Sequence, residues 1–134
     1  MEKPSQGGNI MFNAIHHIAI ICSDYYKAMN FYHELLGFEI IRGNQREHDW
    51  KIDLKVNETT ELELFIRPDA PSRPSYPEAC GLRHLAFAVP SVDDMVKMLE
   101  EKGIACEPIR HDDYTGKKMT FFRDPDGLPL EIHE

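Results

Sequence analysis

The chain has 134 residues, 42% of them hydrophobic, which is enough for one compact domain with a real core. Lys and Arg number 15 against 23 Asp and Glu, which gives a net charge of −8. An acidic surface of this kind repels phosphate backbones and anionic headgroups. We therefore expect neither nucleic acid nor a membrane as a partner, and instead a small-molecule substrate.

The compartment is predicted from what the sequence lacks. No segment approaches the roughly 20 consecutive apolar residues of a membrane-spanning helix, and the N-terminal residues contain no apolar core of a secretory signal. Cys22, Cys80 and Cys106 are odd in number and widely spaced, so we expect reduced thiols without a functional role. These features predict a cytoplasmic protein.

In chain order, the first predicted elements are a loose polar arm over residues 1–11 and a first module over residues 12–67. The module starts with an apolar strand that contains His17. An amphipathic helix over residues 24–36 follows, with Asp24 at its N-cap and Gly37 just past its end. Three strand-like segments complete a βαβββ order: residues 38–43, 49–56 and 61–67.

A linker over residues 68–80 contains four prolines and separates this module from a second one over residues 81–134. The second module begins with a strand around His84. Its helix over residues 92–102 follows Ser91 and ends at Gly103. The remaining strands are predicted at residues 104–109, 117–123 and 128–134, which repeats the βαβββ order.

The two modules match residue by residue as well as element by element. His84 lies 67 residues after His17, and Glu131 lies 68 residues after Glu63. The offsets of the flanking strands and helices agree within one residue, which chance does not readily produce. The sequence thus predicts an internally duplicated α+β fold in a single domain.

Strand alternation selects one histidine in each module. Successive side chains of a strand point to opposite faces, so His17 shares its face with Ala19, and His84 shares its face with Ala86. Small neighbours leave space for a ligand sphere. His16 falls on the face of the apolar residues and is predicted to pack there.

The same alternation turns Glu63 and Glu131 away from the leucines and isoleucines beside them. One histidine and one glutamate per module predict a metal site made of His17, Glu63, His84 and Glu131. Imidazoles and carboxylates suit a borderline divalent ion, zinc or nickel first, with cobalt, manganese or iron as alternatives. Four protein ligands around an octahedral ion leave two positions for water or substrate.

The chain resembles the vicinal oxygen chelate superfamily, specifically its small glyoxalase I-like members, which are built from paired βαβββ modules. The likeness rests on IHHIAI at residues 15–20, FYHELLGFEI at 31–40, CGLRHLAFAV at 80–89 and FFRDPDGLPLEIHE at 121–134. It covers nearly the whole chain. It implies a curved mixed sheet around a metal held by the four residues named above.

The resemblance also implies an activity. Glu at position 63, as a fourth ligand, favours a glyoxalase I-like lyase or isomerase that transfers a proton next to a carbonyl through a metal-chelated ene-diolate. A 2-oxoaldehyde–thiol adduct is one expected substrate. Glu131 is the expected catalytic base, with Glu63 as partner base or ligand. Short chains of this kind commonly form homodimers, with a site inside one chain or shared between two.

Three alternatives stay open on the same fold. A ring-cleaving extradiol dioxygenase or a thiol transferase would use two His and one Glu, and a drug-sequestering module would bind small molecules without catalysis. Residues that could line the pocket are Arg42, Trp50, Phe65, Lys118 and Phe122, although surface or core roles are commoner for these residue types.

Overall fold

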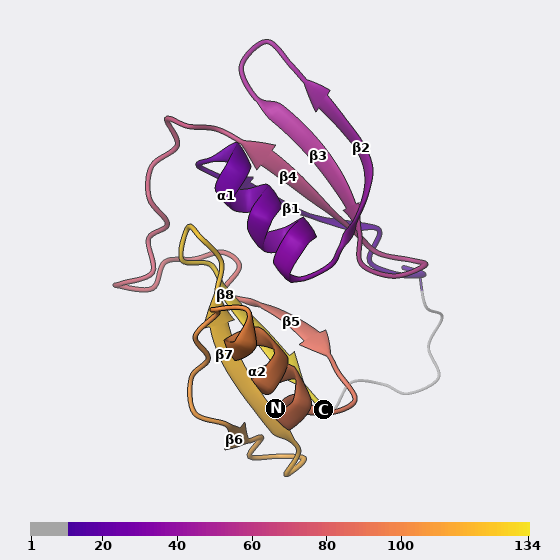
Figure 1. The fold of residues 1–134 in the computed structure, drawn as a ribbon, viewed down its shortest axis with the longest axis vertical. Helices are drawn as coiled ribbons and strands as arrows, with labels where there is room; N and C mark the ends of the chain where they lie inside the picture. The colour runs from indigo at the N-terminus through magenta and orange to yellow at the C-terminus, as the bar shows by residue number, and fades with distance from the viewer. Residues whose placement is uncertain (1–10) are drawn as a thin grey trace.

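The computed structural model describes residues 11–134, so nearly all of the predicted N-terminal arm lies outside the described residues. The first half contains β1 (His17–Cys22), α1 (Tyr25–Met29), the π-helical turn η1 (Asn30–Leu35), β2 (Glu39–Gln45), β3 (Trp50–Lys55) and β4 (Glu61–Ile66). The second contains β5 (Leu85–Ala88), α2 (Val92–Glu101), β6 (Arg110–His111), β7 (Lys118–Arg123) and β8 (Pro129–His133). The element order is therefore βαβββ twice (Figure 1).

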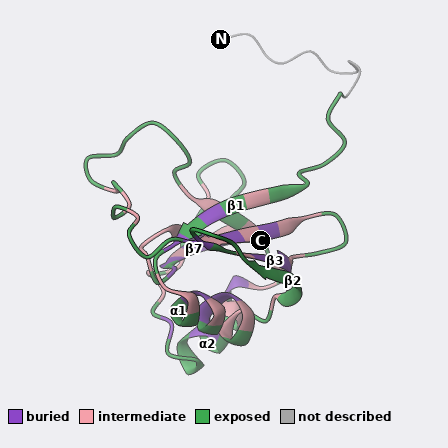
Figure 2. Cartoon of the chain, turned by 90° about the horizontal axis from the view of Figure 1, so that it is seen from above, coloured by how far each residue is buried: buried purple, intermediate pink, exposed green. Residues whose placement is uncertain are grey.

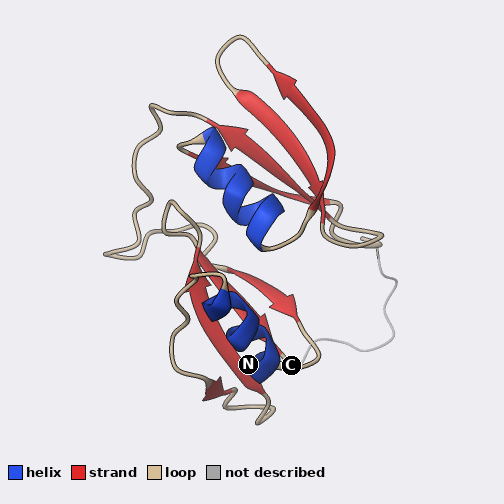
Figure 3. Ribbon diagram, viewed as in Figure 1, coloured by secondary structure: helices blue, strands red, loops and turns tan. Residues whose placement is uncertain are grey.

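Each half forms one four-stranded mixed sheet with its helix against one face (Figure 3). The strand orders are β1-β4-β3-β2 and β5-β8-β7-β6. The first strand of each half runs parallel to the last, and the other neighbours are antiparallel. The predicted α+β fold is confirmed, and β1 and β5 occupy equivalent edges of the two sheets.

Local signals in the sequence set the helix ends as predicted. The side chains of Asp24 and Ser91 each accept a hydrogen bond from the backbone N–H three residues later, at 2.8 and 3.1 Å. Gly37 and Gly103 follow the helices with φ of +80° and +84°, a conformation that costs glycine little. The first helix differs from the prediction in becoming π-helical from Asn30 onward.

One hydrophobic core joins the two halves. Figure 2 shows both helices on the same side of the sheets. The buried residues of both halves form one cluster. Phe31 of η1 lies 6.2 Å from Phe122 of β7, and Phe38 lies 5.6 Å from Phe87 of β5, between ring centroids. The opposite face of each sheet is left for polar side chains. Within residues 11–134, no helix has the length and apolar content needed to cross a membrane.

The predicted strand at residues 104–109 is wrong. The only strand in this region of the described chain is β6, with two residues. Pro108 has no backbone N–H to donate to a ladder. One backbone bond from Glu107 N to Phe121 O, at 2.9 Å, and bonds from the Thr120 hydroxyl to the backbone oxygens of Glu107 and Pro108, at 2.7 and 3.3 Å, hold the segment near β7.

Candidate metal centre

The first predicted ligand pair lies on the polar face of the first sheet. His17 begins β1, and Glu63 lies in the neighbouring β4, opposite Ala19. Leu62 and Leu64 are fully buried against the helix side, which turns Glu63 to the other face. His17 Nε2 and Glu63 Oε1 are 3.6 Å apart.

The second pair repeats this arrangement on the second sheet. His84 directly precedes β5, and Glu131 lies in β8, opposite Ala86. Leu130 and Ile132 are buried in the core, so Glu131 points to the face away from α2. His84 Nε2 and Glu131 Oε1 are 3.1 Å apart. In both halves an alanine stands opposite the glutamate, as the strand phase predicts.

The chemistry of these donors fits a divalent metal. Metal bonds of about 2.0–2.2 Å place adjacent donor atoms roughly 3.0–3.5 Å apart, which is close to the two nitrogen–oxygen separations above. However, no group of three or more His, Cys, Asp or Glu side chains that could hold a metal is found among the described residues 11–134. The described chain brings the four residues together as two separate pairs, which we call half-sites, and the assignment of all four residues to one ion stays a prediction.

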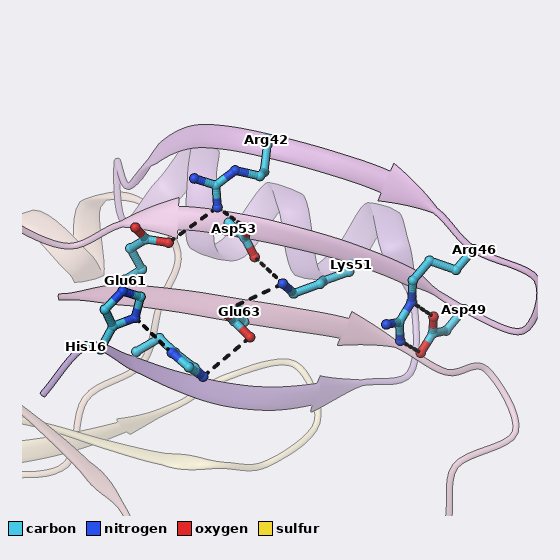
Figure 4. A network of polar contacts seen from close by, with 9 residues as sticks. His16, Arg42, Arg46, Asp49, Lys51, Asp53, Glu61 and Glu63 are labelled. Atoms are coloured by element: carbon cyan, nitrogen blue, oxygen red, sulfur yellow. Dashed lines mark hydrogen bonds and ion pairs between the residues drawn. The ribbon is translucent and has the colours of Figure 1, made fainter.

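A row of charged side chains extends from the first pair across the sheet (Figure 4). Lys51 Nζ lies 3.6 Å from Glu63 Oε2 and 3.6 Å from Asp53 Oδ1. Arg42 donates a hydrogen bond to Asp53 and lies 3.6 Å from Glu61. Glu63 thus has a lysine as well as a histidine beside it, and Arg42 lies on the same polar face.

Asp53 is a residue of this face that sequence reasoning missed. It is 1% exposed and lies between the buried Ile52 and Leu54 on β3. The signal in the sequence was a carboxylate that alternates with apolar residues along a strand. Such a charge needs a partner when it is buried. A bulge in β2 between Ile40 and Arg42 brings the guanidinium opposite Asp53.

His16 does not pack in the core as predicted. His16 is exposed. The residues on the same face of the strand do belong to the core or pack against it. His16 Nδ1 lies 3.0 Å from His17 Nδ1, and a hydrogen bond between these atoms leaves His17 Nε2 on the side of Glu63. A partner on the second ring nitrogen is the usual means of orienting a metal-binding histidine.

The predicted pocket residues divide between site and core. Phe122 is 3% exposed and belongs to the core, the commoner role for an aromatic residue, and it does not line the pocket. Its neighbour Phe121 packs edge-on against His84, with centroids 5.0 Å apart, and lines a cavity of about 300 Å³. Lys118 forms an ion pair at the surface with Asp93, with 2.6 Å between Nζ and Oδ2.

The remaining two predicted pocket residues lie on the first sheet. Phe65 lies in β4 in the same phase as Glu63, and the guanidinium of Arg46 lies 5.1 Å from the centre of its ring. Trp50 starts β3 and packs against Tyr25, with ring centroids 4.9 Å apart. Phe65 therefore shares the polar face, whereas Trp50 contacts the helix side.

Known proteins resemble this chain over most of its length. The Glyoxalase/Bleomycin resistance protein/Dioxygenase superfamily matches residues 14–132. The Bacillus subtilis protein YwkD is 54% identical over 127 residues, covering 93% of this chain and 99% of that protein. The Escherichia coli protein YaeR is 52% identical, covering 90% and 95%. The crystal structure of the glyoxalase family protein from Enterococcus faecalis is 57% identical, with a TM-score of 0.89, and covers 93% of this chain and 100% of that one.

More distant relatives span several chemistries. They include Glyoxylase I 4 of Arabidopsis thaliana at 26% identity, Catechol-2,3-dioxygenase of Bacillus subtilis at 28% and Metallothiol transferase FosB of Staphylococcus haemolyticus at 27%. Both YwkD and YaeR are uncharacterised proteins, so high identity identifies the family and not the reaction. The chain belongs to the Glyoxalase/Bleomycin resistance protein/Dioxygenase superfamily, whose fold it shares with the glyoxalase family protein of Enterococcus faecalis.

Proposed function

We propose that this protein is a metal-dependent, glyoxalase I-like lyase or isomerase that transfers a proton next to a carbonyl. The observation that carries the proposal is the repeated pair of one histidine and one glutamate, separated by 3.6 Å in one module and 3.1 Å in the other. Each module therefore presents the same two types of metal-binding side chain at equivalent positions. A 2-oxoaldehyde–thiol adduct is the proposed substrate, and the cytoplasm the proposed compartment.

The proposed site is shared between two copies of the chain in a homodimer. His17 and Glu63 lie on one sheet and His84 and Glu131 on the other, without a group of three candidate ligands in the described part of one chain. A two-fold dimer brings the first pair of one copy to the second pair of its partner, twice. Each dimer would then hold two equivalent sites with four protein ligands.

A zinc or nickel ion, when bound, would polarise two neighbouring substrate oxygens and stabilise the negative charge that develops on them. Glu131 takes the carbon-bound proton in this proposal. Its carboxylate is 7% exposed and lies beside His84, so it is shielded from bulk water while it holds the proton. Glu63 serves as ligand or as partner base on the opposite side. The edge-on contact with Phe121 keeps the His84 ring in place.

Elemental analysis of the purified protein tests the metal site. His17→Ala and His84→Ala should each lose most of the bound metal, since each removes a ligand. His48→Ala is the matched control, because the side chain of His48 is 88% exposed and lies away from both pairs. A wild-type protein purified without chelators and free of metal would contradict the proposal.

The reaction is tested with methylglyoxal and several thiols on the protein loaded with the metal found. Glu131→Gln should keep most of the metal and lower turnover by about 10²- to 10⁴-fold, the usual contribution of general acid–base catalysis. Unchanged turnover in Glu131→Gln would rule out its role as base.

A second candidate is a site with three ligands, of the kind proposed for a ring-cleaving dioxygenase or a thiol transferase. The observation that favours it is Lys51, which lies 3.6 Å from Glu63 and gives that carboxylate a partner other than a metal. Metal content of Glu63→Ala separates the two candidates. Loss of metal supports four ligands, whereas full retention with bound iron supports the alternative.

A further inference from the structure

The cavity beside His84 is rich in arginine. It has a volume of about 300 Å³ and lies between the segment 73–84 and the second sheet. Four of the chain's seven arginines line it: Arg73, Arg83, Arg110 and Arg123. The acidic side chains among the described residues of its wall are Glu78 and Glu107. In a chain of net charge −8, this cavity therefore has an excess of positive charge.

Two of the arginines share one carboxylate. Arg110 Nη2 lies 3.4 Å from Glu107 Oε1, and Arg123 Nη2 lies 3.4 Å from Glu107 Oε2. Both separations exceed a good charged hydrogen bond, which is about 2.7–2.9 Å. The Arg110 guanidinium carbon also lies over the ring of Phe121, 5.2 Å from its centroid, and that ring contacts His84. Donors of both guanidinium groups therefore remain free for a further anion close to the predicted metal ligand.

A third arginine of the cavity bonds to backbone oxygens and, among residues 11–134, to no carboxylate. Arg73 Nη2 donates to the backbone oxygens of Leu82 and Arg83, each at 2.9 Å, which ties the linker to the segment before His84. Arg73 Nε is buried and has no hydrogen-bond partner in the described part of the chain. A buried donor without a partner is costly, so an acceptor from a ligand would remove an existing penalty.

On the corresponding face of the first sheet, positive and negative side chains occur in different proportions. There Arg42 and Lys51 lie among three carboxylates, Asp53, Glu61 and Glu63. Its cations are thus already paired with carboxylates of the same sheet. The positive excess belongs to the cavity beside His84, which we call the arginine cavity.

We propose that the arginine cavity binds an oxyanion of the substrate, a carboxylate or a phosphate, that lies apart from the oxygens at the metal. The inference rests on the proposed reaction at His84 and Glu131 and adds the substrate class. Guanidinium groups pair with planar or tetrahedral oxyanions through parallel N–H bonds. Arg110 and Arg123 bind the oxyanion and thereby orient the other end of the substrate toward His84. A neutral 2-oxoaldehyde by itself would leave these donors unused.

The test uses the full-length chain without metal, so that anion binding is measured apart from the reaction. Inorganic phosphate and succinate are titrated at fixed ionic strength, with the uncharged succinamide as a control, and binding is followed by backbone amide NMR. Saturable shifts centred on Arg110, Phe121 and Arg123 are expected for at least one oxyanion and none for succinamide. The probe with the lower Kd identifies the source as phosphate or carboxylate.

Matched variants locate the site. Arg110→Gln and Arg123→Gln should each raise the Kd by about tenfold or more, the loss expected for one charged hydrogen-bonding partner. Arg67→Gln removes the same charge on the first sheet, where Arg67 contacts Asp49, and should leave the Kd unchanged. Non-saturable shifts, or equal Kd values in all variants, would overturn the proposal. Metal content is measured in parallel on the protein as purified without chelators: absence of metal there, with anion binding intact, would refute the proposed reaction and leave the anion site standing.

Discussion

At the scale of single residues, Asp49 shows how a buried charge is held at the end of the β2–β3 hairpin. It is 7% exposed and accepts hydrogen bonds from Arg46 at 2.5 and 2.6 Å and from Arg67 at 3.1 Å. The hydrogen bonds from Arg46 are the main cause that lowers the pKa of Asp49 to about 2, from an ordinary value of 3.8. The folded state therefore favours the ionised form.

This shift predicts a dependence of stability on pH. Because the folded pKa lies below the unfolded one, the contribution of Asp49 is fully present above about pH 4 and is lost as the pH falls through about 2. Asp49→Asn should lower the urea midpoint at pH 7 and have little effect near pH 2. Asp69→Asn, at an exposed position, serves as the control. An equal loss in Asp49→Asn at both pH values would contradict the ionic explanation.

Two neighbouring aromatic residues show that residue type alone does not distinguish a pocket residue from a core residue. Phe121 and Phe122 are identical in type, and the sequence offers Phe122 as a possible pocket residue beside its commoner core role. The structure places Phe122 in the core and Phe121 opposite Glu131 in the ladder. Applying the alternation already used for Glu131 to β7 would have identified Phe121, since Thr120 and Phe122 share the buried phase.

At the scale of elements, the turn before β8 ties the two halves together. Asp124 is buried, and its Oδ1 accepts the N–H groups of Asp126 and Leu128, both at 2.9 Å. Its Oδ2 accepts the hydroxyl of Tyr32 from η1, at 2.7 Å. Burial raises the pKa of Asp124, and these hydrogen bonds oppose that effect. Ser23 also contacts Asp126, so the turn is held from the first half at two points.

Removing one hydroxyl tests this connection. Tyr32→Phe leaves a buried carboxylate oxygen of Asp124 without its donor and should lower the free energy of unfolding by about 1–3 kcal/mol. The measurement is urea unfolding followed by circular dichroism. Tyr26→Phe makes the same change at a residue that is 80% exposed and should have no effect. Equal stability of both variants would mean that the Tyr32 contact contributes nothing net.

At the scale of the whole molecule, two half-sites in one chain predict complementation between defective variants. In a shared site, the heterodimer of His17→Ala and His84→Ala contains one site with both mutations and one with none. After random exchange of subunits in an equal mixture, half of the dimers are mixed, so about a quarter of the sites are intact.

Metal content and turnover of the mixture measure this recovery. Each variant alone should bind little metal, whereas the refolded mixture should recover about a quarter of the wild-type level. A mixture of His17→Ala with Glu63→Ala should recover nothing, because both mutations remove ligands from the same half-site. Failure of the first mixture to recover would contradict a site shared between copies.

The sequence by itself determined the duplication, the helix caps, the α+β fold and the pairing of His17 with Glu63 and of His84 with Glu131. These features depend on local preferences and on strand alternation, which the order of residues encodes directly. Only the tertiary structure decided that the two pairs lie on separate sheets, that Asp53 is buried beside Arg42, and that the linker and β7 enclose an arginine cavity. Contacts between segments far apart in the chain depend on how whole elements pack against a common core, and no local pattern specifies that packing.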